Sequence, residues 1–244
     1  MKLELRTDDG LCPAHVFHPA GAGPWPGVLL YMDGVGMRPT LVAMAERLAA
    51  GGYYVLMPDL FYRAGAYEPI DPKKLFADPA VRADWQKRMI QACSPALVMR
   101  DTATFLAHFA AQPNVVQPRI GATGYCMGGR MAFSAAAHYP DRFAAAAAFH
   151  PGGMVSDAPD SPHLLAPKVK ARLFIAAAQD DASFTDEQKG RFEEALRAAA
   201  VDHRFETWPA RHGWVPPDMP THDPAQAERH WQVLLELLGQ MFSR

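Results

Sequence analysis

The stretch Gly121-Ala-Thr-Gly-Tyr-Cys126-Met-Gly-Gly129 determines how the rest of the chain is interpreted. It lies between a short strand-like run at residues 119–123 and a helix-like run at residues 130–138. Within it, Gly124-x-Cys126-x-Gly128 is the pattern of a nucleophile elbow, a sharp strand-to-helix turn, with cysteine at the centre. The residues two before and two after the centre press together, which favours glycine, and the central residue has a strained backbone.

Such an elbow would place the thiol of Cys126 at the carboxyl end of a sheet, beside the free N–H groups of the following helix. Those donors and the helix dipole favour a negative charge, so we expect a lowered thiol pKa and an available thiolate. The alternative is that Cys126 is a small buried hydrophobic residue in a turn that takes part in no reaction.

Composition describes an ordinary globular protein. The chain has 244 residues, of which 49% are hydrophobic and 20% charged, and no linker or repeat divides it, so we expect a single domain over residues 1–244.

The net charge of −2 argues against nucleic acid or an anionic membrane as partner. No apolar run approaches the ~18 residues of a membrane span, and the first residues lack the apolar core of a signal peptide. Three cysteines without metal-ligand spacing predict a reducing, cytoplasmic location and no metal site.

Strand-like and helix-like segments alternate along most of the chain. Residues 28–32 and 53–57 are apolar throughout, as in strands covered on both faces, and a helical pattern at residues 40–50 separates them. This order predicts a parallel sheet with helices on its faces. Further strands are expected at residues 3–7, 14–18, 119–123, 142–149, 171–177 and 203–208, and further helices at residues 97–109, 130–138, 185–200 and 224–241. The alanine-rich run at 142–149 also suits a helix, and its place in the alternation favours a strand.

Residues 60–92 are the irregular part of the chain. Glycine and several prolines interrupt any long element there, whereas the aromatic content argues against disorder. Loops of this length in compact domains usually have a function. We therefore expect a lid-like excursion over the strand ends, with a helix near residues 80–92; a purely structural insertion is the alternative.

Three polar residues follow successive predicted strands at their carboxyl ends, namely Cys126, Asp181 and His212. Ligands of doubly wound sheets bind at that edge, and the order nucleophile, acid, histidine is that of the α/β-hydrolase fold. His212 would take the proton from Cys126, and Asp181 would fix the imidazole tautomer. Taken singly, each has an ordinary explanation as a turn or loop residue, and Asp180 competes with Asp181.

An oxyanion hole formed by two backbone N–H groups is also expected. One group belongs to Met127, directly after the nucleophile, and the other to Gly34, in the loop after the strand at residues 28–32. Asp33 would then lie close to the thiol, although an aspartate before glycine is also a common turn residue.

Four segments of the chain resemble the dienelactone hydrolase family: Gly-Tyr-Cys-Met-Gly-Gly at 124–129, Tyr-Met-Asp-Gly-Val-Gly at 31–36, Pro-Asp-Leu-Phe-Tyr-Arg at 58–63 and His-Gly-Trp at 212–214. The resemblance implies an α/β-hydrolase fold with a mostly parallel central sheet of about eight strands and helices on both faces. It also implies cofactor-free hydrolysis of a small-molecule ester or lactone. Its catalytic triad corresponds to Cys126, Asp181 and His212. Asp181 is preferred to Asp180 because it holds the fourth place of the family's turn, here residues 178–181.

The chain departs from the family pattern at two places. Family members often have a glutamate where Asp33 stands, and it interacts with the resting thiol; aspartate is one methylene shorter. The best-known members carry an arginine a few residues after the catalytic histidine, which binds the substrate carboxylate. In this chain the corresponding residues are Gly-Trp-Val-Pro216, without an arginine. Arg63 and Arg82 in the excursion are the cations considered in its place, and neither aligns with the family's carboxylate-binding arginine.

These two departures affect the expected substrate and leave the expected reaction unchanged. Hydrolase chemistry is expected through an acyl-thioenzyme, whereas dienelactone itself is not assigned as the substrate. Trp214 and the aromatic residues of the excursion suggest a more apolar acyl group or lactone ring. Two alternatives stay open: a hydrolase-fold binding or redox-sensing protein whose thiol is oxidised, and a peptidase. The sequence does not distinguish a monomer from a small homo-oligomer.

Overall fold

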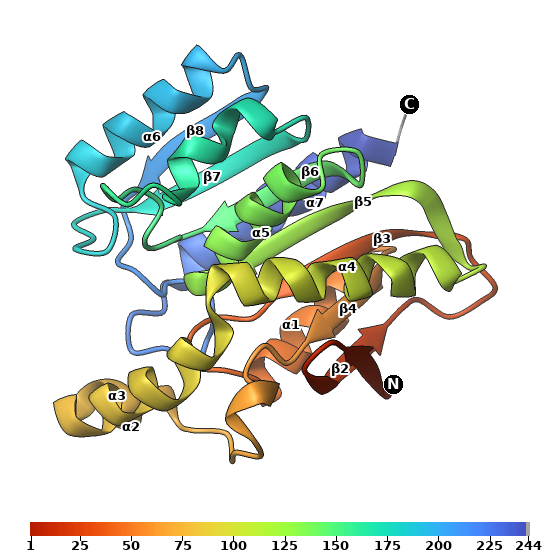
Figure 1. Cartoon of the computed structure of the whole chain (residues 1–244), viewed down its shortest axis with the longest axis horizontal. Coiled ribbons are helices and arrows are strands. Elements are labelled where there is room, and N and C mark those ends of the chain that lie inside the picture. The colour runs from red at the N-terminus through yellow and green to blue at the C-terminus, as the bar shows by residue number, and fades with distance from the viewer. Residues whose placement is uncertain (243–244) are drawn as a thin grey trace.

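A single eight-stranded sheet runs through the computed structural model, which describes residues 1–242 (Figure 1). Its strands are β1 (Lys2–Thr7), β2 (Gly10–Phe17), β3 (Trp25–Tyr31), β4 (Tyr54–Pro58), β5 (Val115–Tyr125), β6 (Phe143–Phe149), β7 (Arg172–Ala178) and β8 (His203–Trp208). The order across the sheet is β1-β2-β4-β3-β5-β6-β7-β8. Only the β1–β2 and β2–β4 pairs are antiparallel. The predicted mostly parallel sheet of about eight strands is therefore confirmed.

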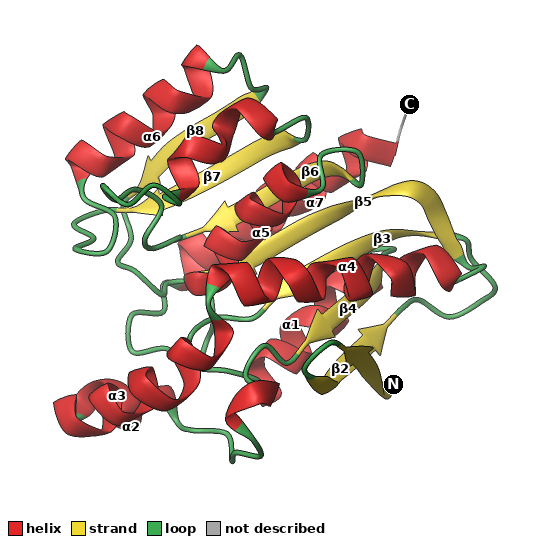
Figure 2. Ribbon diagram, in the orientation of Figure 1, coloured by secondary structure: helices red, strands yellow, loops and turns green. Residues whose placement is uncertain are grey.

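Helices cover both faces of the sheet (Figure 2). They are α1 (Pro39–Ala50), α2 (Pro72–Ala77), α3 (Pro79–Trp85), α4 (Pro95–Ala111), α5 (Met127–His138), α6 (Asp186–Ala198) and α7 (Pro224–Phe242). Helices α4, α5 and α6 lie on the face toward the viewer, and a Phe133–Phe192 ring contact joins α5 to α6. Helices α1 and α7 lie on the other face, where Arg47 stacks on Trp231. No helix of the described chain has the length and apolar character needed to cross a membrane.

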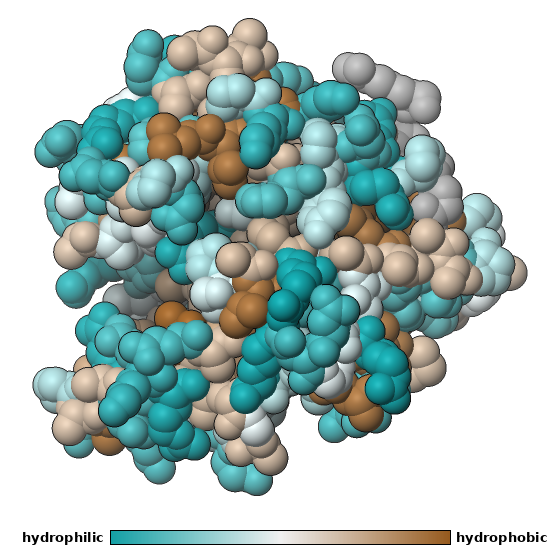
Figure 3. All heavy atoms as spheres, viewed as in Figure 1, coloured by the Kyte–Doolittle hydropathy of each residue, from teal (hydrophilic) through white to brown (hydrophobic). Residues whose placement is uncertain are grey.

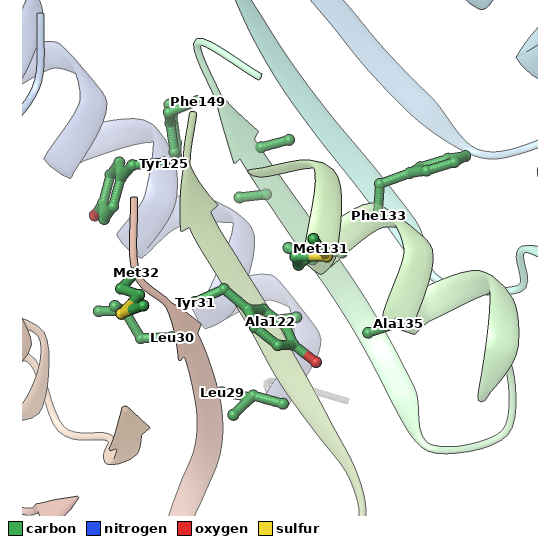
Figure 4. Packing of buried hydrophobic residues seen from close by; sticks show 14 of the residues in the cluster. Leu29, Leu30, Tyr31, Met32, Ala122, Tyr125, Met131, Phe133, Ala135 and Phe149 are labelled. Atoms are coloured by element: carbon green, nitrogen blue, oxygen red, sulfur yellow. The ribbon is translucent and has the colours of Figure 1, made fainter. Parts of the chain in front are cut away.

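The central strands are buried on both faces, which explains their uninterrupted apolar sequences. Side chains of β3, β5 and α5 fill the space between the sheet and the helices, among them Ala122, Met131 and Phe133 (Figure 4). The alanine-rich run forms strand β6, as predicted from the alternation. Its small side chains lie beneath α5, so tertiary packing overrides the helix propensity of alanine.

Two boundaries differ from the sequence prediction. The elbow strand β5 starts at Val115 rather than at residue 119, because Val115 and Val116 pair with the first residues of β3 before a register shift. The excursion has the helix predicted near residues 80–92, as α3 and the helical turns that continue it to Cys93, and it has an additional short helix, α2. Asp71 and Asp78 each cap a new helix with their side chains, and each is followed by proline at the first helical position. Helix α3 continues as a π-helical turn at Gln86–Ile90.

Candidate active site

The turn between β5 and α5 has the geometry of the predicted elbow. Cys126 has φ 54° and ψ −118°, a conformation that L residues seldom adopt. A Cβ atom on Gly124 would lie 2.2 Å from the carbonyl oxygen of Gly128. A Cβ on Gly128 would lie 2.3 Å from the carbonyl oxygen of Tyr31. Glycine is therefore required on both sides of the cysteine, as the pattern indicated.

Asp181 and His212 lie together at the carboxyl ends of β7 and β8. Nδ1 of His212 is 2.6 Å from Oδ2 of Asp181, which is 7% exposed. Ser183 donates to Oδ1 of Asp181 from its backbone N–H, at 2.8 Å, and from its hydroxyl, at 2.6 Å. Asp180 is exposed and makes no contact with His212. The structure thus brings together the carboxylate and the imidazole that the sequence preferred, and adds Ser183, which the sequence did not reveal.

The thiol of Cys126 lies beside His212, close enough for each group to shift the pKa of the other. Burial raises the pKa of the thiol, but the charge of His212 and hydrogen bonds from His212 and the Met127 N–H outweigh burial, so the pKa is lowered. Burial lowers the pKa of His212, yet the thiolate and Asp181 raise it above its usual value. Burial raises the pKa of Asp181, but hydrogen bonds from His212 and Ser183 lower it overall. These pKa shifts favour a thiolate–imidazolium pair beside an ionised aspartate.

His150, directly after β6, holds the backbone of the cysteine. Its Nδ1 accepts the N–H of Cys126 at 3.1 Å, an N–H that also donates to the carbonyl of Phe149 at 3.0 Å. Burial, followed by the nearby charge of His212, keeps the pKa of His150 well below its usual value, so the ring is neutral. The ring proton then lies on Nε2, which is buried and has no hydrogen-bond partner among the described residues. The sequence analysis missed this residue.

Met127 and Gly34, the two residues expected to form an oxyanion hole, both line the cavity beside Cys126. The Met127 N–H opens helix α5 and points to the thiol. The Gly34 N–H has no hydrogen-bond acceptor within residues 1–242. The carbonyl of Gly34 accepts from the indole N–H of Trp85 in the excursion, at 2.9 Å. Helix α3 is thereby attached to the loop after β3.

Asp33 lines the same cavity as Cys126, but its carboxylate is bound by Arg38. Its two carboxylate oxygens accept from Arg38 at 2.8 and 2.9 Å, and Oδ1 also accepts the N–H of Val35. Arg38 extends to Asp218, with Nε 2.6 Å from Oδ2. Asp33 makes no hydrogen bond with Cys126 among the described contacts, although its charge raises the pKa of the thiol. The structure therefore places Asp33 near the sulfur but in an ion cluster that joins the loop after β3 to the loop after His212.

A cavity of about 670 Å³ opens beside the cysteine. Its lining is mainly apolar and combines the strand-end loops with Leu75, Phe76, Arg82 and Trp85 of the excursion. Figure 3 shows a notch between the lobe that holds α2 and α3 and the rest of the molecule. The suggestion that Trp214 contacts an acyl group is wrong: Trp214 is fully buried and packs on His150 and Trp208, outside the cavity lining.

The arginines are arranged differently from the sequence expectation. Arg63 forms ion pairs with Asp9 and Asp101 and does not line the cavity. Arg82 does line it, with its guanidinium over the ring of Phe76. Arg130, one helical turn after Cys126, also lines the cavity and was missed. Its place four residues after the cysteine, at the start of the predicted helix, was the available signal.

No group of three or more histidine, cysteine, aspartate or glutamate side chains suited to a metal ion occurs within the described residues. The three cysteines are unpaired, and Cys12 and Cys93 are buried. Cys126, His212 and Asp181 all line the cavity, an arrangement that suits acid–base and nucleophilic chemistry.

Comparisons with known proteins agree with this architecture. A model of the dienelactone hydrolase family matches residues 12–242. A Methylorubrum extorquens protein provisionally named as a carboxymethylenebutenolidase is 26% identical over 98% of this chain and 80% of its own length. An Escherichia coli K12 protein with the same provisional name is 27% identical, over 89% of this chain and 78% of its own length.

Solved structures show the same fold. A Klebsiella pneumoniae protein provisionally named as a dienelactone hydrolase matches with a TM-score of 0.85 at 24% identity, covering 98% of each chain. A dienelactone hydrolase-like promiscuous phosphotriesterase from metagenomic libraries matches with a TM-score of 0.76 at 21% identity, covering 100% of this chain and 99% of its own. The predicted α/β-hydrolase fold is thus confirmed.

Proposed function

The chain belongs to the dienelactone hydrolase family and is an ester- or lactone-hydrolysing enzyme, and on that premise we propose that it acts through Cys126, His212 and Asp181. The observation that carries this proposal is that the carboxylate, the imidazole and the thiol lie together in the lining of one cavity, with the imidazole bonded to the carboxylate. The expected substrate is a small molecule, because the cavity volume is about 670 Å³.

In the first half of the reaction, the thiolate of Cys126 attacks the carbonyl carbon of the ester or lactone and forms a C–S bond. The carbonyl oxygen becomes an oxyanion, which accepts from the N–H groups of Met127 and Gly34. The intermediate collapses with cleavage of the C–O bond. His212 gives the leaving oxygen its Nε2 proton, since Nδ1 is held by Asp181.

In the second half, the neutral His212 accepts a proton from water as that water attacks the thioester. The C–S bond breaks, the carboxylic acid is released, and the thiolate–imidazolium pair is restored. Asp181 holds the imidazole in one tautomer and stabilises its protonated form in both steps. No cofactor enters this sequence.

We also propose that residues 60–92 act as a lid of a single domain, because side chains of α2 and α3 line the cavity and Trp85 is bonded to Gly34. A working thiolate needs a reducing environment, which supports a cytoplasmic location. All three thiols of the described chain are free, in keeping with such a compartment.

The test compares Cys126→Ala with Cys12→Ala, using p-nitrophenyl butyrate and steady-state rates. Cys12 is buried, lies outside the cavity lining and serves as the matched control. We expect loss of turnover in Cys126→Ala, unchanged turnover in Cys12→Ala, and an acyl adduct on Cys126 detected by mass spectrometry after acid quench. Unchanged turnover in Cys126→Ala would exclude the mechanism. Modification of the thiol by peroxide without any ester turnover would instead favour the redox-sensing alternative.

A further inference from the structure

The turn after β6 connects the nucleophile to the carboxylate of the proposed triad. We refer to residues 150–153, His-Pro-Gly-Gly, as the β6 turn. At its start, Nδ1 of His150 accepts the N–H of Cys126 at 3.1 Å. At its end, the N–H of Gly153 donates to the carbonyl of Ser183 at 2.9 Å, and Ser183 itself donates twice to the triad carboxylate. Hydrogen bonds through one short turn therefore join two groups that come from different strands.

The β6 turn also packs against the imidazole of the triad. The ring centroid of His150 lies 5.1 Å from that of His212, and Trp214 packs edge-on against the His150 ring with a centroid distance of 4.9 Å. A Cβ atom on Gly152 would lie 3.7 Å from Cε1 of His212 and only 2.7 Å from Oγ of Ser183. Glycine at 152 thus lets the turn approach closely, and the turn limits where the imidazole can move.

The hydrogen bond from Cys126 to His150 joins two residues with strained backbones. Cys126 has φ 54° and His150 has φ 39°, both in the left-handed region, which few residues other than glycine adopt. Each such conformation costs on the order of 1–3 kcal/mol and persists only where its surroundings hold it. Because the bond links the backbone of one strained residue to the side chain of the other, it helps to hold both.

The Cys126 N–H does not need His150 in order to be satisfied. It also donates to the carbonyl of Phe149 at 3.0 Å, so it would keep a partner if the imidazole were removed. The second bond exists only because His150 is neutral, since a protonated imidazole has no acceptor nitrogen. Burial, followed by the charge of His212, keeps the pKa of His150 well below its usual value. The contact therefore serves to orient the elbow.

We propose that His150 is a positioning residue of the reaction, an inference that rests on the proposed function of Cys126. Its Nδ1 fixes the direction of the elbow, and its ring supports the imidazole of His212, so the sulfur and the base keep one arrangement during both half-reactions. His150 is 1% exposed and acts through these neighbours. Its loss should therefore change kcat and leave KM nearly constant.

The test compares two substitutions of His150 on p-nitrophenyl butyrate. His150→Leu removes the acceptor, whereas His150→Asn keeps one, because Oδ1 of asparagine takes the place of Nδ1 and asparagine tolerates a positive φ. We expect kcat to fall roughly 10- to 100-fold in His150→Leu and less than about fivefold in His150→Asn, as for a small misplacement of reacting groups. KM should change less than about twofold in both.

Ala200→Leu is the matched control for the strained backbone. Ala200 has φ 53°, is exposed and lies outside the cavity lining, so this variant places leucine in the same backbone region away from the site. Its kcat should equal that of the wild type. If His150→Leu does not fold, as judged by urea denaturation, His150→Gln replaces it. The amide of glutamine lies at the place of Nε2, out of reach of the Cys126 N–H.

Alkylation of Cys126 by iodoacetamide separates this inference from the hydrolytic mechanism, because it needs no turnover. Since His150 is neutral, its removal takes away no charge, and a shifted pH midpoint reports a changed position of the sulfur relative to His212. The midpoint should rise by at least about one pH unit in His150→Leu and return toward the wild-type value in His150→Asn.

A midpoint that asparagine restores supports the positioning role even if the wild-type protein hydrolyses no ester. An unshifted midpoint in His150→Leu counts against it whatever the hydrolysis result. Wild-type kcat in His150→Leu, or an equal loss of kcat in His150→Leu and His150→Asn, would overturn the proposal.

Discussion

Nδ1 of His212 lies 2.6 Å from Oδ2 of Asp181, although 31 residues separate them along the chain. The second oxygen of Asp181 accepts from both the backbone and the hydroxyl of Ser183. The carboxylate therefore has one oxygen fixed by its own turn and the other free to orient the imidazole. This division of its hydrogen bonds distinguishes Asp181 from its exposed neighbour Asp180.

Replacing Asp181 by asparagine should reduce kcat by roughly 10²- to 10⁴-fold, because an amide can hold the wrong imidazole tautomer and does not stabilise its protonated form. Asp180→Asn is the matched control, one residue away and exposed, and should retain wild-type rates. Steady-state hydrolysis of p-nitrophenyl butyrate measures both. Similar losses in the two variants would show that Asp181 has no special role.

The pH dependence of Cys126 alkylation should reveal the ion pair with His212. In the wild-type protein the rate should stay high below the usual thiol pKa of about 8.5, because His212 lowers the pKa of the thiol. In His212→Gln the curve should move to higher pH, because burial raises the pKa of the thiol and no imidazolium is left to lower it. His138→Gln, at the exposed end of α5, should leave the curve in place. The midpoint of iodoacetamide labelling against pH is the measurement, and an unshifted midpoint in His212→Gln would contradict the pairing.

The parts of the site that the sequence predicted are those encoded locally. Gly124 and Gly128 predict the elbow, because other backbone atoms lie too close to these two residues to leave room for a Cβ atom. Chain order and strand ends singled out His212 and the pair Asp180 and Asp181, and the resemblance to the family's turn at residues 178–181 favoured Asp181. The sheet could be predicted because its central strands are covered on both faces and therefore apolar throughout.

The parts that the sequence did not predict depend on distant contacts. Arg38 gives no local sign that it joins Asp33 to Asp218, 180 residues away. Trp214 looked like a pocket residue, but its ring is buried against Trp208. The start of β5 was misplaced because pairing with β3, rather than local propensity, determines where that strand begins.

Gly124→Ala should destabilise the fold by at least about 2–3 kcal/mol, because the new methyl group would overlap the carbonyl of Gly128 and force the elbow open. Gly190→Ala is the matched control. It lies inside helix α6 with no heavy atom within 4 Å of the added Cβ, so it should be neutral or stabilising by up to about 1 kcal/mol. Urea denaturation measures both free energies of unfolding. Equal stability of the two variants would refute the close-contact explanation.

Trp85→Phe should lower kcat/KM about 2- to 10-fold, which corresponds to one lost hydrogen bond. Phenylalanine keeps an aromatic ring between Phe61 and Tyr67 but cannot donate to the carbonyl of Gly34. The loop with the second oxyanion donor then loses its attachment to the excursion. Trp25→Phe, a ring stacked on His18 away from the cavity, should leave kcat/KM unchanged. Wild-type kinetics in Trp85→Phe would show that the bond does not position the loop.

His230 should make the fold sensitive to mild acid. Its ring is fully buried on α7 against Tyr125, and burial lowers its pKa to about 3. The unfolded chain takes up a proton below about pH 6.5, whereas the folded chain does not until far lower pH, so stability falls as pH decreases. Between pH 7 and pH 5 this residue alone should remove about 2 kcal/mol from the free energy of unfolding. Urea denaturation at both pH values should show that loss in the wild type and in His138→Gln, and a loss smaller by that amount in His230→Gln. The same pH dependence in all three proteins would rule His230 out as its source.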